Sequence, residues 1–127
     1  MTNVRVWLGD AVDFLEQRIP EATLAGIRIY FPDPWHKKRH HKRRLIQPDF
    51  VAMRASRLAP GGILHLATDW VPYAEHMLEV LQAASEFVNQ SPDGDYCPQP
   101  AWRPHTKYEA RGDRLGHETR DLIFERT

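Results

Sequence analysis

The chain of 127 residues is long enough for one domain, and its 17 basic side chains balance its 17 acidic ones. A single cysteine, Cys97, excludes an internal disulfide and is typical of a reducing compartment. No apolar stretch approaches membrane-spanning length, and the N-terminus lacks an apolar signal core. We therefore expect one cytoplasmic domain, residues 1–127, with no membrane partner.

The spacing of apolar residues predicts alternating strands and helices. Strands are expected at residues 4–8, 26–31, 63–68, 86–90 and 120–126. Helices are expected at residues 11–19, 48–58 and 72–81, the second of them ended by Pro60, Gly61 and Gly62. This alternation predicts an open α/β sheet with right-handed crossovers.

Acidic residues follow the first three predicted strands: Asp10, Asp33 and Asp69. Ligands of open α/β sheets bind beyond the carboxyl ends of the strands. We therefore expect these three carboxylates to lie on one rim of the sheet.

The stretch "FPDPWHKKRHHKRR" (31–44) joins an acidic turn to nine consecutive Lys, Arg or His residues (36–44), here named the basic segment. Pro32 and Pro34 restrict the backbone around Asp33, so its carboxylate should be held in one direction. Without the six Lys and Arg of the basic segment, the chain would carry eleven cations against seventeen acids. Cations this dense favour a polyanionic partner, and Trp35 offers a surface on which a base can stack. The pattern predicts a nucleic-acid contact, although a proline turn and a solvated charged loop are also common in surface structure.

Metal binding is a weaker alternative for the same stretch. His36 and His40 have the spacing of a helical ligand pair, and Asp33 lies close by in sequence. The intervening cations would repel a divalent ion, so we expect no metal site.

The motif "FPDPWHKKRHHKRRL" resembles the signature of bacterial-type tRNA (guanine-N7)-methyltransferases. The segments "GDAVDFL", "LAPGGILHLATDW", "TKYEARGDRLGH" and "DLIFER" match the same family in order, so the resemblance covers nearly the whole chain. It implies a partial Rossmann-like S-adenosylmethionine-dependent methyltransferase sheet, mostly parallel with a C-terminal antiparallel strand. It also implies transfer of a methyl group from S-adenosylmethionine to guanine N7 in tRNA.

The resemblance assigns a role to each matching residue. Asp10 and Asp33 would contact the cofactor, and Asp33 would also be the catalytic aspartate. The implied substrate-binding residues are Lys37, Asp69, Thr106, Lys107, Tyr108 and Glu109. The implied RNA-binding residues are Arg39, His40, His41, Lys42, Arg43 and Arg44.

Structural interpretations of some of these residues also stay open. Asp10 and Asp69 are each suited to capping the helix that follows. Lys107 and Glu109 could form an ordinary surface pair. Tyr108 and Trp102 could be core aromatics.

The proposed reaction does not call for a base at the methylated atom. Guanine N7 carries a lone pair and no proton, so the enzyme must mainly align N7 with the methyl donor. The product ring is cationic, and a fixed carboxylate can stabilise that charge. We therefore expect Asp33 to orient the base and stabilise charge.

The chain departs from the family pattern by lacking an acidic, glycine-rich cofactor motif. We expect it to be an incomplete domain that is marginally stable, self-associates or pairs with a missing N-terminal half. Two alternatives remain: a catalytically incompetent RNA-binding remnant, and an amino-methyltransferase suggested by Asp33-Pro34-Trp35.

Overall fold

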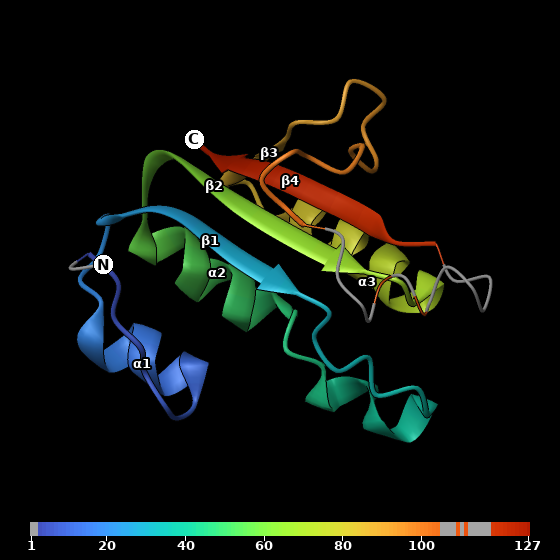
Figure 1. Cartoon of the computed structure of the whole chain (residues 1–127), viewed down its shortest axis with the longest axis horizontal. Coiled ribbons are helices and arrows are strands. Elements are labelled where there is room, and N and C mark those ends of the chain that lie inside the picture. Colours follow the sequence, from blue (N-terminus) through green and yellow to red (C-terminus); the bar gives the residue numbers. More distant parts are fainter. Residues whose placement is uncertain (1–2, 105–108, 110, 112–117) are drawn as a thin grey trace.

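The computed structural model describes residues 3–104, 109, 111 and 118–127 (Figure 1). The elements, in chain order, are α1 (Ala11–Arg18), β1 (Leu24–Tyr30), the 3₁₀ helix η1 (Lys38–Arg43), α2 (Pro48–Arg57), β2 (Leu58–Thr68), α3 (Val71–Ala83), β3 (Phe87–Asn89) and β4 (Arg120–Arg126). The strands form one sheet in the order β1-β2-β4-β3. β1 and β2 are parallel, whereas β4 is antiparallel to both of its neighbours. The expected α/β sheet with an antiparallel C-terminal strand is confirmed.

The prediction of a first strand at residues 4–8 is wrong. This segment contains no strand, and Val6 and Leu8 are 93% and 99% exposed. Trp7 stacks on Phe14 of α1, with ring centres 5.0 Å apart. The alternation of β-forming residues predicted a strand, but a strand also needs a neighbour with which to pair.

The second difference concerns Pro60, Gly61 and Gly62, which lie inside β2 and do not form a turn after α2. The register with β1 jumps from Leu24↔Leu58 to Gly26↔Ile63, so β2 bulges here. Glycine is required at Gly62 because an added Cβ would lie 2.8 Å from the carbonyl oxygen of Ala59. The glycines thus permit a bulge where they were expected to end an element.

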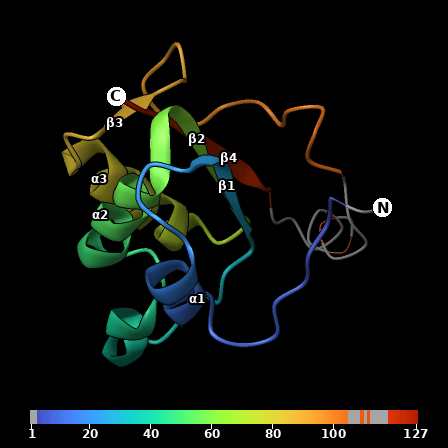
Figure 2. The same ribbon diagram turned by 90° about the vertical axis from the view of Figure 1, so that its left-hand side faces the viewer.

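One face of the sheet is apolar and forms the core. Its register rows include Leu64↔Phe124 and Leu66↔Leu122, and all four side chains are buried. Figure 2 shows α2 and α3 on this side of the sheet, and residues from both helices join the same core cluster.

The other face carries polar groups. Tyr30 pairs with Ala67 and Ala67 with Asp121, so one row crosses β1, β2 and β4. The segment around residue 100 lies on this side (Figure 2). The sheet therefore separates an apolar core from a polar network near the carboxyl ends of β1 and β2.

No helix in the described ranges has the length and apolarity needed to cross a membrane.

Candidate functional site

The acidic turn after β1 has an unusual backbone. Phe31 and Trp35, on either side of Pro32-Asp33-Pro34, both have positive φ angles, of 53° and 45°. Left-handed geometry is costly for bulky residues, by about 1–3 kcal/mol each, and persists only where surrounding contacts impose it. The Asp33 carboxylate accepts a 3.0 Å hydrogen bond from the Trp35 backbone N–H and is otherwise exposed. The turn therefore presents an acid at the end of β1.

Buried contacts with Arg44 support this turn. Arg44 Nε donates a 2.6 Å hydrogen bond to the carbonyl oxygen of Pro34, and its Cζ lies 4.8 Å from the ring centre of Tyr73. The Tyr73 hydroxyl in turn accepts a hydrogen bond from the Ile46 backbone N–H. Burial lowers the pKa of Arg44 and raises the pKa of Tyr73. Arg44 was expected to bind RNA, but its side chain is buried beneath the acidic turn.

A stacked pair joins the turn to the end of β2. His36 lies flat against Trp70, with ring centres 4.0 Å apart and an angle of 8° between the planes. Trp70 directly follows Asp69, and the Phe31 backbone N–H donates a 2.7 Å hydrogen bond to the carbonyl oxygen of Ala67. Asp33 and Asp69 therefore follow two neighbouring parallel strands, as expected.

Asp10 does not share that arrangement. It follows the unpaired segment 3–9 and caps α1, its carboxylate accepting a 2.8 Å hydrogen bond from the Val12 backbone N–H. The expectation that Asp10 follows a strand of the sheet is wrong, and its capping role is confirmed. By contrast, the N-cap of α3 is Trp70 and not Asp69.

Five cations of the basic segment lie on the surface: Lys37, Lys38, Arg39, Lys42 and Arg43. The guanidinium of Arg43 lies over the Trp35 ring, with Cζ 5.2 Å from the ring centre. His40 also contacts Trp35, and His41 is within hydrogen-bond distance of the His36 carbonyl oxygen. The exposed charges therefore adjoin the acidic turn. In the described residues no group of three or more His, Cys, Asp or Glu could hold a metal ion.

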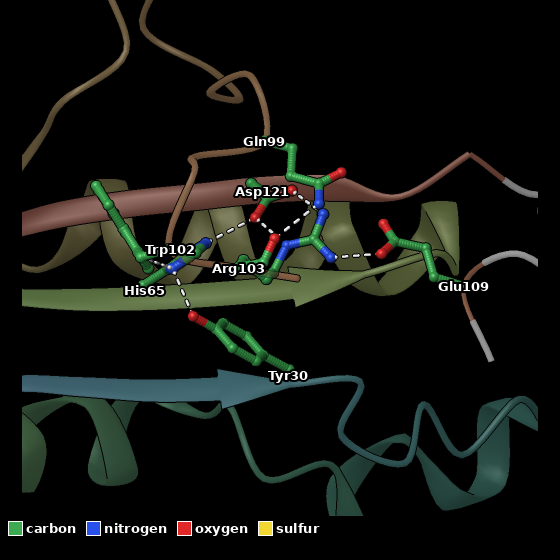
Figure 3. A network of polar contacts seen from close by, with 7 residues as sticks. All are labelled: Tyr30, His65, Gln99, Trp102, Arg103, Glu109 and Asp121. Atoms are coloured by element: carbon green, nitrogen blue, oxygen red, sulfur yellow. Dashed lines mark hydrogen bonds and ion pairs between the residues drawn. The ribbon is translucent and has the colours of Figure 1, made fainter. Parts of the chain in front are cut away.

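A buried network lies on the polar face of the sheet (Figure 3). Arg103 donates from Nε and Nη2 to the two carboxylate oxygens of Asp121, at 2.7 and 2.8 Å. Its Nη1 donates to Glu109 at 2.7 Å. On the other side of the network, His65 Nε2 lies 2.7 Å from Asp121 Oδ2. One arginine thus bridges two buried carboxylates.

The hydrogen bonds of His65 define its tautomer. The indole N–H of Trp102 can only donate, and it points to His65 Nδ1 at 3.1 Å. The Tyr30 hydroxyl is 3.0 Å from the same nitrogen. Nδ1 is therefore the acceptor, and the ring hydrogen on Nε2 is donated to Asp121.

The network also shifts the pKa values of its members. Burial alone would raise the pKa of Asp121, but hydrogen bonds from His65 and Arg103 outweigh it and lower that pKa. Burial likewise opposes the charge of Arg103, yet its bonds to Glu109 and Asp121 raise its pKa. Both charged forms are thus stabilised by pairing.

Of the expected substrate segment, Glu109 lies in this network and is buried, which excludes an exposed surface pair. Thr106, Lys107 and Tyr108 lie outside the described residues. Trp102 is 53% exposed and is not a core aromatic.

The sequence interpretation missed His65, Arg103 and Asp121. The sequence contained a clue to two of them: His65 interrupts the apolar strand "ILHLAT", and Asp121 precedes the apolar residues of "DLIF". Ionisable residues in buried strands usually have a partner.

Comparisons with known proteins agree with the motifs. The model of a family described as "putative methyltransferase" matches residues 1–122. A "tRNA (guanine-N(7)-)-methyltransferase" of Legionella pneumophila (strain Corby) is 57% identical over 98% of this chain and 55% of its own length. Proteins of that name from Alcanivorax borkumensis and Psychromonas ingrahamii are 54% and 56% identical, each over 99% of this chain and 53% or 51% of their own.

A solved structure of an S-adenosylmethionine-dependent O-methyltransferase from Thermotoga maritima superposes with a TM-score of 0.47 at 14% identity, over 91% of this chain and 37% of that one. The chain spans about half the length of the curated relatives it matches. The resemblance predicted from the motifs is confirmed, and because the family model covers residues 1–122, the chain belongs to this methyltransferase family.

Proposed function

We propose that this chain carries the catalytic and RNA-binding part of a tRNA (guanine-N7)-methyltransferase. The observation that supports this most directly is the constrained Asp33 turn beside five exposed cations. The relatives that share 54–57% of its residues carry that name. The substrate is then tRNA, the methyl donor is S-adenosylmethionine, and the product contains 7-methylguanosine.

The described residues fit one part of the methyl donor. S-adenosylmethionine carries a positive sulfonium and supplies the methyl group when bound. The exposed carboxylate of Asp33 suits a cation at the end of β1. Asp10 accepts one backbone hydrogen bond and is exposed, so its carboxylate remains able to accept from an adenosyl group. The glycine-rich loop typical of such sites is not in this sequence.

Asp33 acts on the guanine by orientation and charge. It accepts hydrogen bonds from the guanine N1 and N2 donors, which directs N7 toward the methyl group. The purine becomes cationic as N7 is alkylated, and the nearby carboxylate stabilises that charge. No proton leaves N7, so Asp33 does not need to be a base.

Other residues would bind the substrate around this point. Asp69 follows the neighbouring strand, and Asp69 and Glu109 would both contact the edge of the base. Lys37 would contact the RNA. Thr106, Lys107 and Tyr108 are also predicted to bind the substrate. Arg39, His40, His41, Lys42 and Arg43 would hold the polynucleotide through phosphate contacts that position it and do not read its sequence.

Two substitutions at Asp33 test the role of the charge. Asp33→Asn keeps an oxygen that can accept the Trp35 N–H, so the turn is preserved, whereas Asp33→Ala removes both acceptor and charge. If the carboxylate charge is needed, both variants lose about 10²- to 10³-fold in methyl transfer while tRNA affinity changes less. The measurement is tritium transfer from labelled S-adenosylmethionine into tRNA, with nucleoside analysis of the product.

The outcomes separate the alternatives. Normal turnover by Asp33→Asn would limit Asp33 to shaping the turn. Binding of tRNA without binding of S-adenosylmethionine would favour the RNA-binding remnant. Methylated adenine in the product would indicate the amino-methyltransferase.

The fold also suggests how the domain associates. β1 is an edge strand of the described sheet, and Val6 and Leu8 are exposed next to α1. Open edges and apolar patches favour pairing with further chain. We therefore propose that residues 1–127 form one incomplete domain of a cytoplasmic protein, which self-associates or pairs with an N-terminal half.

A further inference from the structure

Two aromatic rings meet between the acidic turn and the end of β2. His36 and Trp70 lie face to face, with ring centres 4.0 Å apart and planes 8° from parallel. Trp70 is partly buried and packs against the core cluster, whereas His36 is exposed. Because Trp70 covers one face of the His36 ring, the part of that ring open to solvent lies on its opposite face and edges. The pair thus presents a flat aromatic surface to a ligand.

Both rings are carried by ordered backbone. The carbonyl oxygen of Trp70 accepts hydrogen bonds from the backbone N–H groups of Tyr73 and Ala74, at 3.1 and 2.9 Å, where α3 begins. On the other loop, the carbonyl oxygen of His36 lies 3.3 Å from Nε2 of His41. A surface that is fixed in advance loses less conformational freedom when a ligand binds to it.

This surface lies between the two acidic loops. His36 follows Asp33 by three residues, so their Cα atoms are at most about 11 Å apart. The hydrogen bond from the Trp35 N–H to the Asp33 carboxylate closes the turn that separates them. Trp70 directly follows Asp69 at the end of β2. A base held by Asp33 would therefore lie within reach of the His36 ring.

Trp35 is less suited to stack on a base, although the sequence pointed to it. The guanidinium of Arg43 lies over its ring, with Cζ 5.2 Å from the ring centre, and the ring centre of His40 is 5.8 Å away. An incoming base would have to compete with these contacts. Among the described residues, by contrast, Trp70 is the one ring that pairs with His36. The structure therefore favours His36 as the stacking surface.

Resting on the proposed function, we propose that the exposed face of His36, supported by Trp70, is the surface on which the target guanine stacks beside Asp33. Aromatic side chains bind unstacked bases of RNA in this way. Stacking on His36 fixes the plane of the base, whereas the Asp33 carboxylate fixes its edge. Both restraints help to align N7 with the methyl donor.

Two substitutions separate stacking from other roles of His36. His36→Phe keeps a flat aromatic ring, whereas His36→Leu keeps a similar bulk without one. We expect His36→Leu to lower kcat about 5- to 150-fold and His36→Phe to keep it within about threefold of wild type. The affinity for tRNA should change little in either variant, because phosphate contacts dominate it. Equal losses in both variants, or no loss in either, would overturn the proposal.

The support from Trp70 is tested by a double-mutant cycle. In a Trp70→Leu background, His36→Leu should cause a smaller further loss of kcat, because residues in contact are not additive. Losses that multiply would show that His36 does not depend on Trp70, which contradicts the proposal.

Trp7 provides a matched control. Its half-exposed ring also stacks on a neighbour, Phe14 of α1, with ring centres 5.0 Å apart. Trp7→Leu should therefore leave kcat unchanged. A loss equal to that of His36→Leu would mean that exposed ring pairs act only through the fold, and the proposal would fail.

A second readout requires neither activity nor a variant that folds. The wild-type chain is titrated with a uridine hexamer that carries one central guanosine, and the ring ¹H–¹³C signals of His36, assigned through His36→Phe, are followed. A stacked purine should shift these signals upfield, whereas a hexamer with an abasic residue in place of the guanosine should not. Unmoved signals, or equal shifts with both hexamers, would overturn the proposal. If the wild-type chain transfers no methyl group to tRNA, the proposed function fails, while these spectra still decide whether a purine stacks on His36.

Discussion

Arg44 donates a hydrogen bond to the carbonyl oxygen of Pro34, which couples the end of the basic segment to the acidic turn. The same guanidinium lies over Tyr73, inside the core. The six cations of the segment therefore divide into five on the surface and one that supports the turn.

This division predicts different effects of two neighbouring substitutions. Lys42→Gln removes an exposed charge, so the slope of log affinity for tRNA against log salt should fall in magnitude by roughly 0.9. Arg44→Gln should leave that slope unchanged and lower the free energy of unfolding by about 1–3 kcal/mol, because a buried carbonyl loses its donor. Filter binding at several salt concentrations and urea denaturation provide the two measurements. A smaller salt slope in Arg44→Gln would show that Arg44 contacts phosphate.

Arg54 is a destabilising feature of α2. It is fully buried with its Cζ 3.9 Å from the ring centre of Phe50, and within the described part of the chain none of its guanidinium nitrogens has a hydrogen-bond partner. Burial lowers its pKa to about 10, so Arg54 is still charged at neutral pH, but holding that charge in the fold costs free energy of folding. Arg54→Met should raise the free energy of unfolding by about 1–4 kcal/mol, measured by urea denaturation.

The control for this prediction is Arg57→Met. Arg57 donates to carbonyl oxygens of α1, so its loss should destabilise the chain. Destabilisation by Arg54→Met would mean that the buried guanidinium has partners, such as bound water.

The pairing of Asp121 predicts how stability depends on pH. Its pKa is lowered below the ordinary value of 3.8, so near that pH the folded chain binds fewer protons than the unfolded chain. The stabilisation is complete above the ordinary value and is lost as pH falls through the lowered pKa. Asp121→Asn should be less stable near neutral pH, by about 3–5 kcal/mol, and should lose less of its stability on acidification. Urea denaturation between about pH 3 and about pH 7 measures both effects. Parallel curves for the two proteins would contradict this prediction.

The exposed N-terminal residues predict concentration-dependent association. Val6→Ser with Leu8→Ser should shift the chain toward monomer in analytical ultracentrifugation and change the free energy of unfolding by less than about 0.5 kcal/mol. Val88→Ser, at a half-exposed position on β3, is the control and should not alter association. A wild-type chain that is monomeric at every concentration would refute the prediction.

Features that depend on neighbours in sequence were predicted well. β4 occupies residues 120–126 as expected, and α3 begins within one residue of Pro72. The juxtaposition of Asp33 with the surface cations follows from their proximity in the chain. Periodicity and proline positions were sufficient for these features.

Features that depend on pairing between distant segments were not predicted. His65 and Asp121 meet only because β4 lies antiparallel beside β2, and Arg103 reaches them from a separate segment. The burial of Arg44 depends on Tyr73 of α3. Residues 4–8 have the sequence pattern of a strand but form none. A strand needs a neighbouring strand to pair with, and the local sequence does not show whether one is present.

The central position of β4 has a consequence for folding. β4 follows every other element in the chain, yet it pairs with both β2 and β3. The sheet is therefore completed only after a long loop closes, and such non-local contacts form slowly. Until then β2 presents an open edge to other chains, so aggregation during refolding should depend steeply on protein concentration. Dilution and rapid removal of denaturant should improve recovery more than any change that stabilises the finished sheet.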